Sequence, residues 1–217
     1  MAGRRLTQQQ QGRIQRLQDR RRHRSDQAIP EDEADLGPEQ AGLAITNHGA
    51  TVMVEDSEGR LQRCSVRQNL GRLACGDQVI WQVSGPAGGV VTAVVERRSL
   101  LTRPDFQGQP RPVAANLDAV VVVLAPEPNF SEDLIDRYLV AIAAIGVQGL
   151  LVLNKHDLLD EAALASLLNR LEPYHRMAYP LLPVSSRTSY GLDDLRAWLR
   201  GRTSLLAGQS GVGKSSL

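Results

Sequence analysis

The feature that most constrains the fold of this 217-residue chain is a glycine-rich pattern near its carboxyl end. Residues 208–215 read Gly-Gln-Ser-Gly-Val-Gly-Lys-Ser and match G-x-x-x-x-G-K-[ST], which is typical of phosphate-binding loops. Glycines let such a loop turn tightly and direct successive N–H groups at phosphate oxygens, between a strand and a helix. The apolar residues 204–207 fit the preceding strand. A glycine-rich turn without a ligand is the alternative.

The sequence around this loop alternates strands with helices. Residues 119–124 (AVVVVL) form a continuous apolar run, as expected for a parallel strand covered on both faces. Further strands are predicted at 149–153, 181–185 and 204–207, and helices at 161–171 and 192–199 and after Ser131, a predicted N-cap. This alternation predicts a doubly wound α/β sheet over residues 116–217, whose ligands bind at the carboxyl ends of the strands.

An earlier segment, residues 40–96, has a different rhythm. Apolar residues alternate with polar ones at Leu43/Ile45, Val52/Val54 and Val79/Trp81, with turn signals between them. Five short strands in so short a segment predict a β-barrel of the oligonucleotide-binding (OB) type. A small barrel without a nucleic-acid role is the alternative. Residues 97–115 contain Pro, Gly and Arg and are predicted to be a linker.

The first 39 residues are predicted to be a disordered charged leader. Residues 1–25 hold eight arginines and one acid, whereas residues 26–39 hold six acids and no base. The arginines fit nucleic-acid binding through phosphate neutralisation, and a leader that binds nothing is the alternative.

Bulk properties favour a cytoplasmic protein. Cys64 and Cys75 are the only cysteines, too few for a disulfide framework or a zinc site. The first 25 residues have no apolar segment of a secretory signal, and no apolar run is long enough to span a membrane. The four histidines show no metal-ligand spacing.

A second motif, Asn154-Lys155-His156-Asp157, follows the strand predicted at 149–153 and matches N-K-x-D. An ionised Asp157 can accept hydrogen bonds from guanine N1–H and its 2-amino group, a pattern that adenine does not offer. Asn154 is expected to bond the base or brace the phosphate loop, and the Lys155 stem to cover the ring. An ordinary loop in which Asp157 caps a helix is the alternative.

Ser185-Ser186 follows another predicted strand and is the expected third element of guanine recognition, through a backbone N–H aimed at O6. A helix-entry turn is the alternative. Lys214 is the predicted catalytic residue, set against the β- and γ-phosphates, and the Ser215 hydroxyl is the predicted Mg²⁺ ligand. The predicted nucleotide contacts are Asn154, Lys155, His156, Asp157, Ser185, Ser186, Gly208, Gln209, Ser210, Gly211, Val212, Gly213, Lys214, Ser215 and Ser216.

Two matches to D-x-x-G, at 56–59 and 105–108, are expected to be simple turns. The γ-phosphate motif of that form follows a buried parallel strand, whereas these lie at a β-turn and in the predicted linker.

The three motifs occur in an inverted order, because N-K-x-D precedes the phosphate loop. In this order the chain resembles the RsgA (YjeQ) family, circularly permuted GTPases of small ribosomal subunit biogenesis. Residues 115–118 (Ala-Asn-Leu-Asp) and 134–139 (Leu-Ile-Asp-Arg-Tyr-Leu) match it as well. The resemblance implies an OB barrel that contacts ribosomal RNA, use of GTP/GDP and Mg²⁺, hydrolysis stimulated by the ribosome, and a monomer that docks on the small subunit.

The family continues beyond the phosphate loop with a helix, a switch threonine, a D-x-x-G strand and a zinc-binding domain. The expectation is therefore a C-terminally incomplete chain, truncated after the P-loop, with no zinc ligands, which neither hydrolyses GTP usefully nor folds its α/β part stably alone. The alternatives are an RNA-binding OB module with a non-catalytic nucleotide site and a P-loop ATPase.

Overall fold

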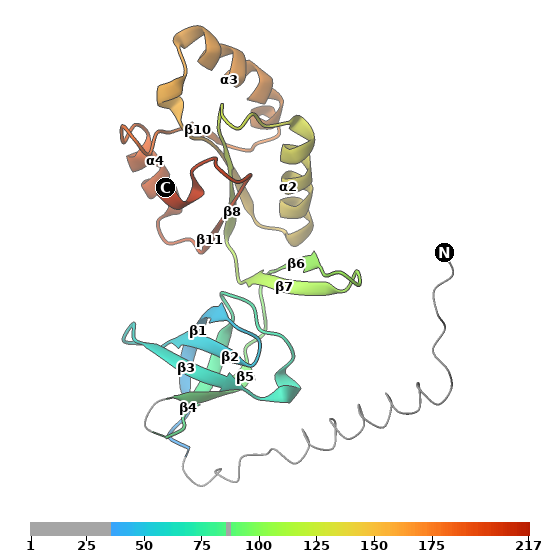
Figure 1. Cartoon of the computed structure of the whole chain (residues 1–217), viewed down its shortest axis with the longest axis vertical. Helices are drawn as coiled ribbons and strands as arrows, with labels where there is room; N and C mark the ends of the chain where they lie inside the picture. The colour runs from blue at the N-terminus through green and yellow to red at the C-terminus, as the bar shows by residue number, and fades with distance from the viewer. Residues whose placement is uncertain (1–35, 86–87) are drawn as a thin grey trace, which may run out of the picture.

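Two folded units follow one another in the computed structural model, which describes residues 36–85 and 88–217. Figure 1 shows a β-barrel at one end, an α/β unit at the other, and a two-stranded ribbon between them. Residues 1–35 of the predicted charged leader lie outside the described residues.

The first unit is a closed five-stranded barrel. Its strands are β1 (Gln40–Asn47), β2 (Thr51–Glu55), β3 (Leu61–Val66), β4 (Gln78–Val83) and β5 (Gly89–Val94), with a 3-10 turn, η2 (Gln68–Leu70), between β3 and β4. They close in the order β1-β2-β3-β5-β4, and only the β3–β5 pairing is parallel. Val52, Val54, Val79, Trp81 and Val91 fill the interior, so the alternating pattern marks the inward residues of β2 and β4. In β1 the pattern was wrong, because Leu43 is exposed and Ala44 lies in the core. The predicted OB-type barrel is confirmed.

Both D-x-x-G segments are turns, as predicted. Asp56 closes the β2–β3 connection by accepting the Gly59 N–H at its carbonyl (3.0 Å), and Asp105 does the same for Gly108 (3.0 Å). Each carboxylate also accepts two backbone N–H groups of its own turn. Asp and Gly are therefore explained by turn chemistry.

The segment predicted as a linker contains a β-ribbon that the sequence analysis did not foresee. β6 (Leu100–Pro104) pairs antiparallel with β7 (Pro110–Ala115). Both strands contain proline, which lacks an N–H. Proline is tolerated here because in a two-stranded ribbon each strand has an outer edge where no N–H donor is needed. Leu101 and Ala114 pack into the core of the α/β unit, so the ribbon belongs with that unit.

The second unit is a parallel sheet in the order β10-β9-β8-β11. Its strands are β8 (Ala119–Leu124), β9 (Gln148–Leu153), β10 (Leu181–Pro183) and β11 (Ser204–Ala207). Val120, Val122 and Leu124 of β8 pack beneath α2 (Glu132–Ile145) and α3 (Glu161–Arg176). Val121 and Val123 pack on the other face with α4 (Leu192–Leu199). Burial on both faces explains the unbroken apolar run and confirms the α/β fold.

Three local expectations differ from the structure. Ser131 precedes α2, but its side chain makes no capping hydrogen bond. α3 continues five residues past the predicted end, through Pro173, and thereby buries Tyr174 in the core. Lys214–Ser216 form a 3-10 turn, η4, where the phosphate-loop pattern predicts the start of a helix. Among the described helices, none is long and apolar enough to cross a bilayer.

Candidate nucleotide-binding site

Three loops meet at one edge of the sheet because they follow parallel strands. The segment 154–157 follows β9, Ser185-Ser186 follows β10, and residues 208–213 follow β11. Parallel strands place their carboxyl ends at the same edge, so motifs far apart in sequence lie together.

Asn154 connects all three loops. Its side chain is fully buried; Nδ2 donates to the Val212 carbonyl in the phosphate loop (2.9 Å), and Oδ1 accepts the Ser186 N–H (3.3 Å). Its backbone N–H donates to the Leu124 carbonyl at the end of β8 (2.8 Å). The geometry is therefore that of a brace. Removing it would leave buried polar groups without partners.

Asp157 is held in place by the serine loop. The Ser185 hydroxyl donates to Asp157 Oδ1 (2.6 Å) and accepts the Thr188 N–H (3.1 Å), so it acts as both a donor and an acceptor. Arg187 Nη1 lies 3.5 Å from Oδ2. The Ser185 hydrogen bond, supported more weakly by Arg187, lowers the pKa of Asp157 below its ordinary value. The carboxylate is therefore ionised at neutral pH and accepts hydrogen bonds only.

The phosphate loop needs glycine at two positions for steric reasons. Gly213 has φ +92° and Gly208 has φ +143°, both in the range that disfavours side chains. A Cβ at Gly213 would collide with Asn154 Nδ2, and one at Gly208 would collide with the Val123 carbonyl. The loop is therefore pressed against the brace below it.

Lys214 folds back over the loop. Its ammonium donates to the carbonyls of Gly208 (2.9 Å) and Gln209 (2.6 Å), which hold the charge above the loop. Ser210, Ser215 and Ser216 are exposed beside it. A glycine cradle, one fixed cation and an exposed hydroxyl fit a phosphate chain with Mg²⁺, a cation that prefers oxygen ligands.

Two contacts made by predicted site residues escaped the sequence analysis. His156 stacks on Tyr190 with ring centroids 4.4 Å apart and an angle of 11° between the planes. The contact joins the N-K-x-D segment to the chain after Ser185-Ser186. Lys155 has a left-handed backbone (φ +60°), and its Nζ donates to the Glu127 carbonyl (2.6 Å). No local pattern announces these contacts, since their partners lie 28 or more residues away in sequence.

A cleft of about 600 Å³ lies at the opposite edge of the sheet, lined in part by Arg98, Asp118, Gly146 and Arg202. It sits at the amino ends of β8 and β9, whereas open parallel sheets bind their ligands at the carboxyl ends. The candidate nucleotide site is therefore the one formed by the three loops and not the cleft.

Comparison with known proteins agrees with this geometry. The model of the RsgA GTPase family matches residues 94–217, more than half of the chain. The chain belongs to the RsgA GTPase family. The resemblance inferred from the motif order is thereby confirmed, and the RsgA match includes the ribbon as well as the sheet.

Individual relatives extend the similarity to the barrel. The small ribosomal subunit biogenesis GTPase RsgA of Azotobacter vinelandii is 48% identical over 226 residues, covering all of this chain and 66% of its own length. The protein of the same name from Pseudomonas aeruginosa (strain LESB58) is 46% identical over 222 residues, again with 66% of its length covered. The chain thus spans slightly less than two thirds of these RsgA relatives.

Two solved structures share the fold. YjeQ from Thermotoga maritima matches with a TM-score of 0.69 and 34% identity, over 82% of this chain and 63% of its own. YloQ, described as a circularly permuted GTPase, matches with a TM-score of 0.64 and 28% identity, over 87% of this chain and 65% of its own. The RsgA-type arrangement of a barrel before a permuted nucleotide-binding sheet therefore recurs.

Proposed function

We propose that this chain carries the nucleotide-binding part of a cytoplasmic, monomeric GTPase factor for late maturation of the small ribosomal subunit. The factor binds GTP with Mg²⁺ and hydrolyses it to GDP when the ribosome stimulates it. Its partners are the small subunit and ribosomal RNA, the latter at the barrel. The observation that carries the proposal is Asn154, which joins the three nucleotide loops, in a chain of the RsgA family.

Guanine selectivity follows from Asp157. Its ionised carboxylate would accept the guanine N1–H and one hydrogen of the 2-amino group, which are adjacent donors on one edge of the base. Adenine presents no such pair and would leave a carboxylate unpaired. Ser186 is proposed to share its N–H between guanine O6 and Asn154 Oδ1, which accepts that N–H at 3.3 Å.

Phosphate binding follows from the loop itself. The backbone N–H groups of 208–215 and the ammonium of Lys214 neutralise the β- and γ-phosphates, with stabilisation that grows as negative charge develops on the leaving oxygen. Ser215 would hold Mg²⁺ through its hydroxyl, and the ion supplies further charge neutralisation when bound.

Base recognition is tested by Asp157→Asn. An asparagine donates where aspartate accepts, so it should lower GTP affinity about 100-fold and improve binding of xanthosine triphosphate, which has a carbonyl in place of the 2-amino group. Binding of fluorescent nucleotides to purified protein measures both. Asp160→Asn is the matched control, because that side chain caps α3 outside the site and asparagine caps equally well. Unchanged base preference in Asp157→Asn, with ATP bound as well as GTP, would favour the ATPase reading.

Hydrolysis is tested by Lys214→Ala in the full-length protein. Loss of the ammonium should reduce ribosome-stimulated turnover by about 100-fold or more. The competing function is an RNA-binding module with a silent nucleotide site. Under that function, Lys214→Ala would leave subunit maturation and release from the ribosome unchanged.

A further inference from the structure

The barrel and the α/β unit have separate hydrophobic cores. Among the described elements, no barrel strand packs broadly against the sheet or its helices. Units without a large apolar interface move relative to one another by default. Their orientation therefore depends on the few polar contacts where the chain passes from barrel to sheet.

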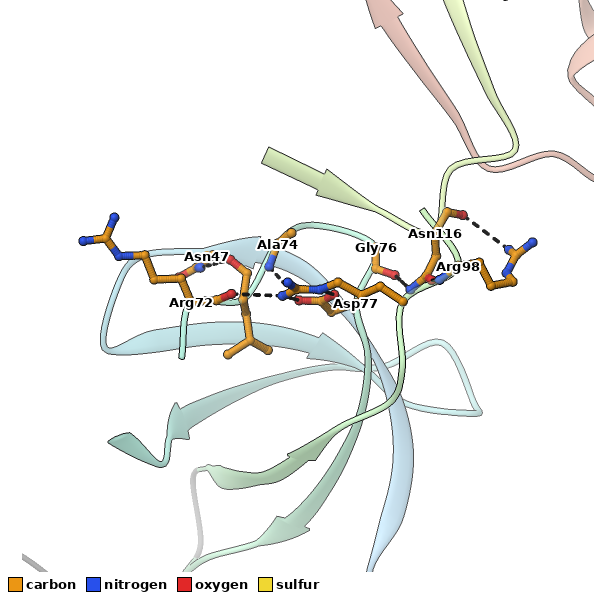
Figure 2. A network of polar contacts seen from close by, with 9 residues as sticks. Asn47, Arg72, Ala74, Gly76, Asp77, Arg98 and Asn116 are labelled. Atoms are coloured by element: carbon orange, nitrogen blue, oxygen red, sulfur yellow. Dashed lines mark hydrogen bonds and ion pairs between the residues drawn. The ribbon is translucent and has the colours of Figure 1, made fainter. Parts of the chain in front are cut away.

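The barrel side of this passage is a loop, residues 71–77, held by an ion pair between the buried Asp77 and the partly exposed Arg97. Asp77 is fully buried; it accepts the Ala74 N–H at Oδ2 (2.7 Å) and Arg97 Nε at Oδ1 (2.7 Å). The Gly76 N–H donates to the Ala44 carbonyl in β1 (2.8 Å). Figure 2 shows the loop with Ala74, Gly76 and Asp77 gathered against the barrel. The loop thus moves with the barrel.

Asn116 crosses from the α/β unit to that loop. Its side chain is buried; Nδ2 donates to the Gly76 carbonyl (2.8 Å), and Oδ1 accepts the Arg98 N–H (2.9 Å), as Figure 2 shows. The Ala115 N–H donates to the Cys75 carbonyl beside it (2.8 Å). Asn116 adopts φ +56°, a conformation that asparagine tolerates better than most residues.

Asp118 then links the passage to the strand of the phosphate loop. Arg98 Nη1 donates to Oδ1 (3.1 Å), and the Thr203 N–H donates to Oδ2 (2.8 Å). β11 begins at the next residue and leads directly into Gly208. The stretch 115–118, singled out by its resemblance to the RsgA family, therefore has a place away from the nucleotide.

We propose that Arg98, Asn116 and Asp118 form an interdomain joint that fixes the barrel on the sheet and transmits barrel contacts to the phosphate loop through β11. They are positioning residues and touch no nucleotide. The transmission part rests on the proposed function, since it requires subunit-stimulated hydrolysis. The orientation part stands on the joint alone. With a rigid joint, a partner bound at the barrel can shift the conformation of the phosphate loop. With a loose joint, the barrel moves on its own and the loop is unaffected.

The decisive variant is Gly76→Ala. A Cβ at Gly76 would collide with the Ala115 carbonyl and push the barrel loop off the joint. Gly49→Ala is a matched control in the same barrel, because Gly49 has a similar positive φ (+83° against +88°) but nothing within 4 Å of its Cβ. Both variants place a side chain at a positive φ, and only one of them disturbs the joint.

Two readouts separate orientation from chemistry in the full-length protein. Spin labels at Glu58→Cys in the barrel and Asp193→Cys on α4, both exposed, report the distance between the units. Cys75→Ser removes the exposed native thiol, and the buried Cys64 remains unlabelled. GDP affinity, basal hydrolysis and hydrolysis with small ribosomal subunits are measured alongside.

Gly76→Ala should broaden the distance distribution and lower the stimulation by about tenfold, with GDP affinity and basal rate within twofold of the parent. Gly49→Ala should change none of these. If Gly76→Ala fails to fold, Arg98→Ala tests the same joint, because it removes an exposed guanidinium and the bond to Asp118. Arg176→Ala, which breaks an exposed ion pair within α3, is its control.

Unchanged distances in the joint variants would overturn the joint. Broadened distances with full stimulation would overturn transmission. Absence of stimulation in the parent protein would instead reject the proposed function, and the distances alone would then decide whether the joint orients the barrel.

Discussion

The two ends of the parallel sheet use the same chemistry for different tasks. At the carboxyl ends, buried Asn154 donates to a loop carbonyl (Val212 O) and accepts a backbone N–H (Ser186). At the amino ends, buried Asn116 does the same with Gly76 O and the Arg98 N–H. An amide side chain is suited to both roles because it offers donors and an acceptor on one rigid plane.

An aspartate follows each asparagine, and the difference lies in what it faces. Asp157 accepts the Ser185 hydroxyl at Oδ1 and has Arg187 Nη1 3.5 Å from Oδ2, and in the proposed function this carboxylate also meets the base. Asp118 uses its oxygens to accept from the Thr203 N–H and from Arg98, two groups of the chain itself. The carboxyl end keeps acceptor capacity for a ligand, whereas the amino end uses it to join parts of the chain. Mutations at the two ends should therefore separate binding from architecture.

The largest effect is expected from Asn154→Ala. It leaves the Val212 carbonyl and the Ser186 N–H without their partner and frees the phosphate loop, so nucleotide affinity should fall about 100-fold. Titration with fluorescent GDP measures the loss. Gly213→Ala should act similarly, since its Cβ would displace Asn154, while Gly201→Ala, which has φ +72° and open space, should not. Equal affinities for Gly213→Ala and Gly201→Ala would contradict the role of Asn154 as brace.

The matching change at the other end, Asn116→Ala, should cost stability and spare binding. Loss of two buried hydrogen bonds predicts a decrease of about 1–3 kcal/mol in the free energy of unfolding. Denaturant melts measure it, and GDP affinity of the folded protein should stay within twofold. Asn116→Gly relieves the positive-φ strain but does not restore the two hydrogen bonds. Its free energy of unfolding should therefore lie between those of Asn116→Ala and the parent. Asn169→Ala, at an exposed site on α3, is the control. A large loss of GDP affinity in Asn116→Ala would erase the distinction between the ends.

The site at the carboxyl ends of the strands could be predicted from the sequence more easily than the contacts at the amino ends, for a physical reason. The strand 119–124 and the three loops carry local signals: a continuous apolar run, glycines and a short ordered motif. Asn116 carries no such signal, because Gly76 lies 40 residues away and the bond forms only once both units have folded. The ribbon β6–β7 escaped for another reason. Its prolines favour a loop locally, and packing of Leu101 and Ala114 on the sheet outweighs that preference.

Acid should lower the stability of the fold at both ends of the sheet, because it protonates Asp118 and Asp157. The Thr203 N–H, followed by Arg98, lowers the pKa of Asp118, and the Ser185 hydroxyl lowers that of Asp157. A carboxyl whose folded pKa lies below its unfolded value contributes stability above the unfolded pKa and loses it as pH falls through the folded one. Thermal melts from pH 7 to pH 3 should show the deficit of Asp118→Asn shrinking below about pH 4. A deficit independent of pH would mean that Asp118 acts through shape and not charge.

Salt distinguishes the two partners of Asp118 within the same experiment. Arg98 is exposed, so screening at high ionic strength should remove its contribution, whereas the bond from the Thr203 N–H should persist. The stability difference between Arg98→Ala and the parent should therefore vanish in 1 M salt, while that of Asp118→Asn remains.

The smallest effect is expected from the aromatic contact at the carboxyl end, the His156–Tyr190 stack. Aromatic pairs contribute about 0.5–1.5 kcal/mol beyond their buried area, and Tyr190 is more than half exposed, which favours the low end. Tyr190→Leu keeps apolar bulk but removes the stacking plane, so GDP affinity should fall about twofold to fivefold. Tyr190→Phe keeps the ring and should bind like the parent. Equal losses for Leu and Phe would assign the effect to the hydroxyl, and no loss for either would mean that hydrogen bonds alone hold the base-reading loops together.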